Sequence, residues 1–260
     1  MTAPEVTAIA SRDNPLLKEL RRLSQDATAY RRAGRVWLEG DHLCRAALQR
    51  GIVPEVAVFA DSCAAHLRVE LSPGARRIVT LADALFDGIS ALGSPARMGF
   101  VIELPAAEAL QPGAASVVLD RLQDAGNVGS ILRSAAAFGL RQVIALKGTA
   151  ALWSPKVLRA GMGAHFGLQL HEGLAGADLD ALAVPLIVTS SHEGLLLQDQ
   201  RLPWPCAWVL GHEGQGVSPE VAARAGLLVR IGQPGGEESL NVAAAAAICL
   251  HASALSASGG

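Results

Sequence analysis

The spacing of apolar residues changes along the chain from a helical period to short continuous runs. Over residues 14–34 the leucines between Leu16 and Leu23 fall on one face of a helix, while the basic residues between them face away. Asn14 followed by Pro15 is a typical helix start, because the Asn side chain accepts from a free backbone N–H and proline suits the first turn. This spacing predicts an amphipathic helix near the N-terminus.

The rest of the first hundred residues alternates short apolar runs with helical segments. Strands are predicted at 36–40 and 55–60, and helices at 41–51, where Gly51 ends the helix, and at 82–90. Such alternation is typical of a small α/β unit.

The second half repeats the alternation with more apolar runs. Strands are predicted at 116–120, 142–146, 185–190, 206–211 and 227–232. Helices are predicted at 128–138, 154–163, 218–225 and 239–255. Because near-continuous apolar runs indicate a parallel sheet covered on both faces, we predict a doubly wound α/β domain that binds its ligand at the carboxyl ends of the strands.

Residues 104–116 separate the two halves. They are rich in Ala, Pro and Gly and have no amphipathic period, which favours a linker. The predicted division is a domain at 1–104, a linker at 105–115 and a second domain at 116–260.

Composition adds few constraints. Half of the residues are hydrophobic and only 4% are aromatic, which favours close packing of helices on a sheet. The N-terminus lacks the basic start and apolar core of a signal peptide, and the longest apolar stretch, 242–250, is too short to cross a bilayer. We expect a soluble, cytoplasmic protein without a membrane partner. The four cysteines form no C-x-x-C pair, so buried free thiols are favoured over a metal site or disulfides.

The formal net charge of −2 hides an uneven distribution. Residues 12–35 carry seven Lys or Arg against three acids, and residues 161–260 carry three Arg against nine acids. This asymmetry indicates that the basic segment meets a polyanion. A solvated helix face explains the basic segment equally well when that segment is taken alone.

Three unusual loops follow predicted strands. The first, 121–139, has neither G-x-G-x-x-G spacing nor a Gly-Lys-Ser/Thr sequence, which argues against a dinucleotide fingerprint and a P-loop. The one charge on its helix, Arg133, lies about one and a half turns beyond Asn127. Two interpretations of Arg133 are equally supported at this point: a functional cation neutralised by an anion, or a surface arginine on a half-exposed helix.

The second loop, 209–218, places three glycines and Glu213 at the exit of a buried strand. Glycines there allow a sharp turn and a close approach of backbone to a ligand, so a binding site is favoured. The third loop, 231–248, runs through a glycine and proline turn into a helix. The polar residues at the start of that helix are Glu237, Glu238, Ser239 and Asn241. Part of this pattern is ordinary helix capping.

Together these loops resemble the three motifs of the SpoU family of RNA ribose 2′-O-methyltransferases, within the SPOUT superfamily. The first motif, Asn-x-Gly followed by Arg in a helix, corresponds to 127–129 and Arg133. The second, Leu-Gly-x-Glu-Gly-x-Gly, corresponds to 210–216. The third, Ser-Leu-Asn-Val-x-x-Ala, corresponds to 239–245. Three motifs in this order and spacing are highly specific.

The resemblance extends over nearly the whole chain. The segment 154–166 is similar to a segment that lies between the motifs in the family, and much of the first hundred residues resembles the substrate-binding domain of many members. The loop positions that differ from the residues usual in the family are Ala125, His212 and Gly232.

The resemblance implies a fold, a cofactor and an assembly. It implies an α/β-knot domain with a mostly parallel sheet, in which a C-terminal trefoil knot forms the S-adenosylmethionine pocket, preceded by a small α/β substrate-binding domain. It also implies a homodimer packed around the knot, and we expect no metal. The residues that it assigns to the cofactor are Leu210, Gly211, Glu213, Gly214, Gly216, Ile231 and Leu240.

The catalytic residue that the resemblance implies is Arg133. A guanidinium stays protonated in proteins, so we expect Arg133 to grip a phosphate and to stabilise charge developing on the 2′ oxygen, with phosphate or water taking the proton. Asn127 is expected to orient Arg133 or the ribose, and Glu213 to brace the second loop. Ser239 and Asn241 are expected to shape the site.

RNA is the expected substrate, and basic residues are expected to hold its backbone. These residues are Arg12, Lys18, Arg21, Arg22, Arg31, Arg32, Lys156 and Arg159. Ribosomal RNA, in particular 23S RNA, is favoured over transfer RNA, because the first domain resembles that of ribosomal-RNA members. Two alternatives stay open: a transfer-RNA ribose methyltransferase, and a non-catalytic RNA-binding or ribosome-assembly factor with the same fold.

Overall fold

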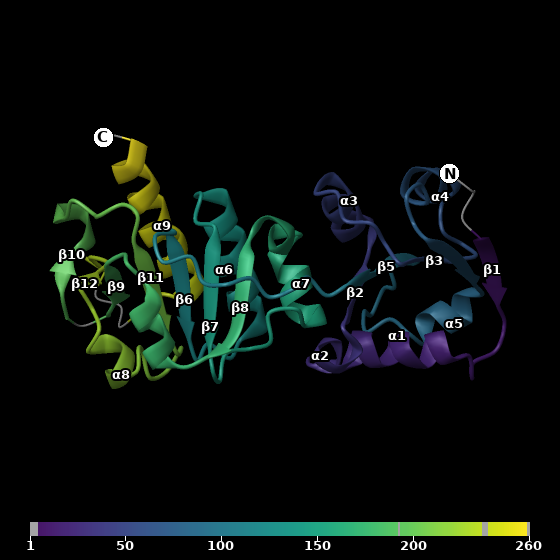
Figure 1. The fold of residues 1–260 in the computed structure, drawn as a ribbon, viewed down its shortest axis with the longest axis horizontal. Coiled ribbons are helices and arrows are strands. Elements are labelled where there is room, and N and C mark those ends of the chain that lie inside the picture. The colour runs from purple at the N-terminus through teal and green to yellow at the C-terminus, as the bar shows by residue number, and fades with distance from the viewer. Residues whose placement is uncertain (1–4, 192, 236–238, 259–260) are drawn as a thin grey trace. The chain divides into compact units, whose positions relative to one another are not determined.

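The structure is a computed structural model that describes residues 5–191, 193–235 and 239–258. Its internal contacts divide the chain into two compact units (Figure 1). The first unit comprises Met1–Ala106 and Trp153–Phe166, and the second comprises Ala107–Leu152 and Gly167–Gly260. The segment Trp153–Phe166 therefore groups with the first unit, although the sequence places it between strands of the second.

The first unit is built on a mixed five-stranded sheet. Its strands are β1 (Glu5–Ile9), β2 (Arg35–Glu39), β3 (Val56–Ala60), β4 (Arg77–Leu81) and β5 (Met98–Glu103). They lie in the order β1-β4-β3-β5-β2, with β5 antiparallel to both of its neighbours and the other pairs parallel. The strands predicted at 36–40 and 55–60 are confirmed as β2 and β3, whereas β1, β4 and β5 were not predicted.

Helices cover this sheet. They are α1 (Pro15–Gln25), α2 (Ala29–Ala33), α3 (Asp41–Gln49), α4 (Ala65–Leu71), α5 (Asp83–Asp87) and α7 (Pro155–Gly161). α1 begins as predicted, because the Asn14 side chain accepts from the Leu16 amide at 2.9 Å and proline occupies the first turn. The predicted helix at 14–34 is divided, with α2 as a separate short helix.

The helix α7 packs against α1 and β2 within the first unit. Just after α7, Gly163 has a φ of +85°, and a Cβ added there would lie 2.5 Å from the Cβ of Ala46 on α3. Both the backbone conformation and the close approach of α3 therefore require a glycine at position 163.

The second unit holds a seven-stranded sheet. Its strands are β6 (Ser116–Asp120), β7 (Gln142–Leu146), β8 (Gln169–Leu174), β9 (Leu186–Thr189), β10 (Leu195–Leu196), β11 (Ala207–Gly211) and β12 (Leu227–Arg230). They lie in the order β10-β12-β9-β11-β6-β7-β8, and each adjacent pair is parallel. The predicted parallel sheet is confirmed. The edge strands β8 and β10 were not predicted, because they are only partly buried.

The order of the strands is that of a doubly wound sheet. The chain starts in the middle with β6 and builds outward through β7 and β8. It then crosses to the other side, where β11 inserts between β6 and β9. Such a reversal brings several strand-end loops to the same edge of the sheet. The trefoil knot stays a prediction.

The longer helices of the second unit are α6 (Ala125–Ala137) and α9 (Val242–Ser258), which pack against each other. Shorter elements are α8 (Pro219–Ala222) and the 3₁₀ segments Gly176–Ala181 and Leu197–Asp199; another 3₁₀ segment, Ala164–Gly167, follows α7. α9 begins later than the predicted helix at 239–255, because the Asn241 side chain accepts from the Ala243 and Ala244 amides and so precedes the first turn. Its position on the sheet is fixed where the Trp208 indole N–H donates to Ser253 Oγ at 2.7 Å, both groups being buried.

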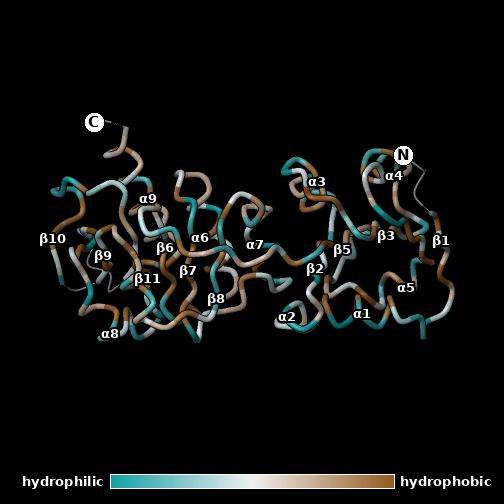
Figure 2. Tube along the Cα trace, in the orientation of Figure 1, coloured by the Kyte–Doolittle hydropathy of each residue, from teal (hydrophilic) through white to brown (hydrophobic). Residues whose placement is uncertain are grey.

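The core of the second unit lies on the central strands. β6, β7 and β11 are buried along their whole length, and Figure 2 shows the hydrophobic stretches of the chain on the strands inside each unit. Within the described ranges, none of the helices combines the length and hydrophobicity that a membrane crossing requires. Cys44, Cys63, Cys206 and Cys249 are free and buried, as predicted.

Residues 105–115, predicted as a linker, contain no helix or strand. Their second half runs along the second unit: the Gln111 amide donates to the Gln142 side-chain oxygen at 2.8 Å, and the Ala183 amide donates to the Pro112 carbonyl at 2.8 Å. The assignment of substrate binding to the first domain and methyl transfer to the second stays a prediction.

Candidate functional site

A cavity of about 670 Å³ lies at the carboxyl ends of β9, β11 and β12 in the second unit. Its walls come from the segments that follow these strands, together with the start of α9. Small-molecule sites in proteins have volumes of roughly 300–1,000 Å³, and doubly wound sheets bind ligands at this edge. The cavity therefore has the size and the position of a ligand site.

The turn after β11 forms one wall through its backbone. His212 and Gly216 pair with each other, with N–H···O distances of 3.0 and 2.8 Å, which closes a tight turn. A Cβ added to Gly211 would lie 2.2 Å from the Gly216 carbonyl carbon and from the Val217 nitrogen. Only glycine allows this crossing of backbone on backbone.

Side chains from all three motif loops join in one hydrogen-bonded chain beside the cavity. The Glu213 carboxylate accepts from Asn127 Nδ2 and from the Asp124 amide, each at 3.2 Å. Asn127 Oδ1 in turn accepts from Asn241 Nδ2 at 3.0 Å. Because Asn241 also caps α9, this chain ties the first turns of α6 and α9 to the turn after β11. We refer to these three residues, Asn127, Glu213 and Asn241, as the motif chain.

The environment of Glu213 favours its ionised form. Partial burial raises the pKa of this carboxyl, but hydrogen bonds from backbone amides and from the Asn127 side chain outweigh burial and hold the pKa below its ordinary value. Asn127 Nδ2 then donates to a carboxylate, which makes the hydrogen bond charge-assisted.

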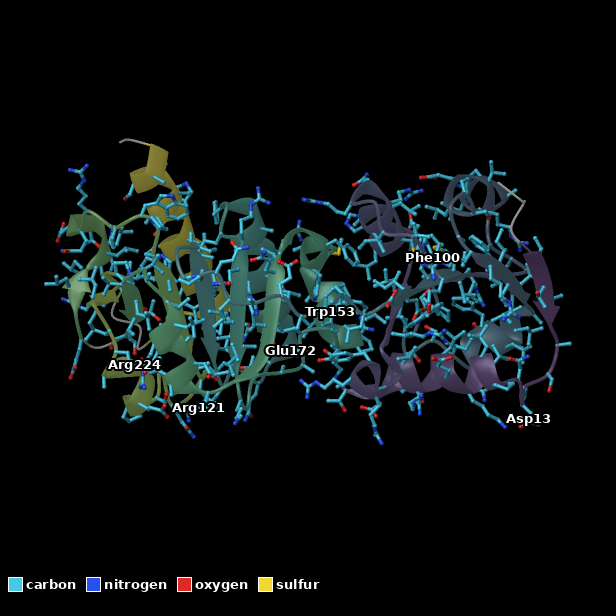
Figure 3. All side chains as sticks on the ribbon, in the orientation of Figure 1. Asp13, Phe100, Arg121, Trp153, Glu172 and Arg224 are labelled. Atoms are coloured by element: carbon cyan, nitrogen blue, oxygen red, sulfur yellow. The ribbon has the colours of Figure 1, made fainter. Side chains whose placement is uncertain are left out.

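A second brace reaches the same turn from the end of β6. Arg121, which has a φ of +61°, donates from Nη1 to Gln215 Oε1 at 3.0 Å and from Nη2 to the Gly216 carbonyl at 3.5 Å. The neighbouring Asp120 carboxylate, almost fully buried, accepts from the Ser218 amide at 2.5 Å. Figure 3 shows Arg121 at the lower edge of the view, below the strands of the second unit.

Most of the residues assigned to the cofactor lie on the cavity wall. Those that line it are Gly211, Glu213, Gly214, Gly216, Ile231 and Leu240. Leu210 does not line it, because its side chain points into the core and is fully buried. Ser239 and Asn241 also line the cavity. Glu237 and Glu238 lie outside the described residues.

Arg133 does not reach the cavity within this chain. Its side chain is exposed on α6, and it is absent from the residues that line the cavity. Within the described parts of the chain it forms no ion pair. Asn127 lies about one and a half helical turns earlier on α6. Its side chain is held by hydrogen bonds to Glu213 and Asn241, the other members of the motif chain. The structure therefore brings Asn127 to the site and leaves the Arg133 guanidinium exposed to solvent.

Sequence reasoning missed one wall of the cavity. Thr189, the last residue of β9, lines it, as do Ser190 and Glu193, which follow β9. Gln233, which follows β12, also lines it. The signal that could have found them is their position just after predicted strands at the binding edge of a doubly wound sheet. No motif marks them, because polar residues at strand ends are common in any loop.

The eight basic residues assigned to RNA fall in one compact unit. Lys156 and Arg159 lie on α7, which groups with the first unit, where the other six also lie. The exposed side chains are those of Arg12, Lys18, Arg22, Arg31, Arg32 and Lys156, and the half-buried ones are those of Arg21 and Arg159. Among the described residues, no cluster of His, Cys, Asp and Glu could hold a metal ion.

Comparison with known proteins identifies the family. Residues 114–251 match the model of the SpoU rRNA Methylase family. The chain belongs to this family. The 23S rRNA (guanosine(2553)-2′-O)-methyltransferase RlmP of Bacillus subtilis is 30% identical over 218 residues, which cover 82% of this chain and 86% of that protein.

Solved structures of SpoU-type proteins share the fold. The AdoMet-bound rRNA methyltransferase from Sinorhizobium meliloti is 25% identical with a TM-score of 0.82, covering 95% of this chain and 97% of that one. The SpoU methyltransferase AviRb from Streptomyces viridochromogenes, in complex with AdoMet, is 23% identical with a TM-score of 0.83, covering 95% and 100%. The α/β fold with a parallel sheet is thus confirmed as that of SpoU methyltransferases.

Proposed function

We propose that this SpoU family member transfers a methyl group from S-adenosylmethionine to a ribose 2′-hydroxyl of RNA. The observation that carries the proposal is the motif chain, which joins one residue from each family motif beside a cavity at the binding edge of the sheet. The relative RlmP is named for the same reaction on 23S rRNA. An intact motif chain also favours an enzyme over a non-catalytic RNA-binding factor with the same fold.

The residues of the cavity fit the cofactor. The volume suits a molecule of this size, and glycine backbone at 211, 214 and 216 allows close approach. One buried acceptor, Gln233 Oε1, has no hydrogen-bond partner among the described residues. Glycine backbone, Ile231 and Leu240 would hold the cofactor, which supplies a methyl group already activated on a sulfonium.

Within this reaction the chain has to hold the RNA and favour loss of the 2′ proton. The Arg133 side chain is exposed on α6. We assign it to an adjacent phosphate, from which its charge stabilises the developing negative charge on the 2′ oxygen. The proton passes to a phosphate oxygen or to water, and Asn127 orients the ribose or Arg133.

The exposed surface of α9 and the neighbouring α6 supports a homodimer. α9 carries a stripe of exposed small and apolar side chains, Ala244, Ile248 and Leu255, the last two being 43% and 60% exposed. α6, which packs beside α9, exposes Arg133 and Ala137. Burying this surface against a second copy would remove apolar area from water. It would also place Arg133 at or near the interface.

The substrate that we favour is ribosomal RNA, in particular 23S RNA, and the reaction then takes place in the cytoplasm. The first unit supplies a basic surface for the RNA backbone, through the eight residues named above. The test is to map 2′-O-methyl positions in total RNA from cells with and without the gene. A position lost from 23S RNA supports this choice, and a position lost from transfer RNA instead would replace it.

The role of Arg133 has a direct test with a matched control. Arg133→Lys keeps the charge but loses the planar fork that binds phosphate, so methyl transfer should fall by about a hundredfold while the Kd for S-adenosylmethionine stays within about twofold. Arg141→Lys changes another exposed arginine of the same unit, just before the amino end of β7. This control should leave both the methyl-transfer rate and the Kd for S-adenosylmethionine unchanged. Near-full turnover of Arg133→Lys would remove the proposed role.

A further inference from the structure

Several hydrogen-bond acceptors on the cavity wall are engaged by the protein itself. Besides the Glu213 carboxylate, His212 Nδ1 accepts from the Gly214 and Gln215 amides at 3.0 and 3.3 Å. Gln215 Oε1 accepts from Arg121. These acceptors hold the protein's own loop in place and are not available for a ligand without loss of that support.

Gln233 differs from these residues. Its side-chain oxygen is buried, yet within the described residues it accepts from no donor. A buried acceptor without a partner costs roughly 1–3 kcal/mol, and such groups in native structures usually have a water or ligand partner. Since Gln233 lines the cavity, a molecule that fills the cavity can supply the missing donor.

The surroundings of Gln233 indicate which part of a ligand lies there. Val229 lies in β12, and Ile231 and Gln233 follow that strand; all three line the cavity. Val188 and Leu228 also line it, so the part of the wall that includes Gln233 is largely apolar. An aromatic ring fits an apolar wall that carries one acceptor.

We propose that Gln233 Oε1 accepts a hydrogen bond from the exocyclic amino group of the adenine ring of S-adenosylmethionine. This rests on the proposed function, and it makes Gln233 a specificity-determining residue for that cofactor. Adenine is the flat, largely apolar part of the molecule, and its amino group is a donor at the rim of the ring. The α-ammonium group of the cofactor is a cation, which a carboxylate matches better. The Glu193 carboxylate provides one on the cavity wall.

The experiment combines a protein change with a ligand change. Calorimetry measures the Kd of S-adenosylmethionine and of its analogue in which hydrogen replaces the adenine amino group, for the wild type and for Gln233→Met. Met has a similar length but lacks a strong acceptor. In the wild type, removing the amino group should weaken binding by about tenfold, because the acceptor is left unpaired. In Gln233→Met the two ligands should differ by less than about twofold.

The control is Gln198→Met, which changes an exposed glutamine near Gly232 that does not line the cavity. It should discriminate between the two ligands as the wild type does. Thermal unfolding of all variants checks that each is folded, and Gln233→Glu, which keeps an acceptor, should retain the tenfold preference if Gln233→Met is unstable.

The outcomes separate the inference from the proposed function. If wild-type protein binds no S-adenosylmethionine, the proposed function and the inference both fail. If the wild type binds the cofactor and Gln233→Met keeps the tenfold preference for the amino group, only the inference fails. A Gln233→Met variant that instead loses discrimination against the 3′-deoxy analogue would assign the acceptor to the ribose and overturn the adenine assignment.

Discussion

The backbone crossing at Gly211 allows a sharp test of how the turn after β11 builds the cavity. Replacing Gly211 with Ala places a methyl group 2.2 Å from two backbone atoms, of Gly216 and Val217, whereas ordinary contact begins at 3.4 Å. Neither neighbour is a flexible side chain, so the turn itself has to open. Overpacking typically costs 1–3 kcal/mol, and occasionally more. We expect a loss of about 3 kcal/mol, because both clashing atoms are backbone.

Two other glycines of the same turn provide the comparison. At Gly214 an added Cβ has its nearest neighbours at 3.9 Å, so Gly214→Ala should be nearly neutral. At Gly216 the space is open but φ is +68°, so Gly216→Ala should cost about 1–2 kcal/mol through backbone strain alone. Gly211→Ala thus tests steric exclusion, Gly216→Ala tests backbone strain, and Gly214→Ala is a control that introduces neither.

The measurements are thermal unfolding and calorimetric titration with S-adenosylmethionine. Each kcal/mol should lower the Tm by roughly 2–4 °C for a chain of this size, so Gly211→Ala should unfold about 6–12 °C below the wild type. Its affinity should also fall by more than about tenfold, because Gly216 and Val217 line the cavity and have to move. If Gly211→Ala were as stable and bound as tightly as Gly214→Ala, the crossing would not have the geometry described.

Other features lead to further expectations. Arg121→Gln should weaken cofactor binding about fivefold by freeing Gln215 and Gly216, whereas Arg224→Gln, which breaks a surface ion pair with Asp180 away from the cavity, should leave affinity unchanged in the same titration. Ser253→Ala should lower the unfolding free energy by about 1–3 kcal/mol in chemical denaturation, because the buried Trp208 indole N–H loses its acceptor. A change below about 0.5 kcal/mol would contradict this. The contribution of Glu213 to stability should be fully present above its ordinary pKa of 4.5 and should be lost as the pH falls through its lowered folded-state value. Comparing unfolding of the wild type and Glu213→Gln across acid pH checks the sign, and a difference that grows on acidification would refute it. RNA binding should weaken steeply with salt in a filter-binding assay, and a flat response would exclude the basic surface as the main contact.

Sequence patterns predicted the parts of the fold that are continuous and buried. β6, β7 and β11 are largely apolar and are buried along their whole length, so their burial and their parallel pairing followed from their near-continuous apolar runs. β8 and β10 lie at the edges of the sheet and are partly exposed. Their residues pair through the backbone but are not consistently buried. The sequence there therefore shows no continuous or alternating apolar pattern.

The candidate site was predictable where side-chain identity is constrained. Glu213, Asn127 and Asn241 belong to motifs, and their mutual hydrogen bonds show why those residue types are needed. Gln233 could not be singled out, because a glutamine after a strand is ordinary until the cavity and the unpaired oxygen are known. The position of Arg133 could not be derived either, since a lone arginine on a helix fits both a site and a solvent-exposed surface.

The grouping of Trp153–Phe166 with the first unit has a practical consequence for anyone who wishes to separate the two units. The polypeptide passes from one unit to the other near residues 106, 152 and 166. One break in the linker therefore leaves Trp153–Phe166, a part of the first unit, covalently joined to the second. A fragment that starts at residue 116 would carry α7 without α1, β2 and Ala46, the neighbours against which it packs. Truncation at the linker should therefore expose apolar surface on the remaining fragment. A permuted or internally deleted gene is the better starting point for an isolated methyltransferase unit.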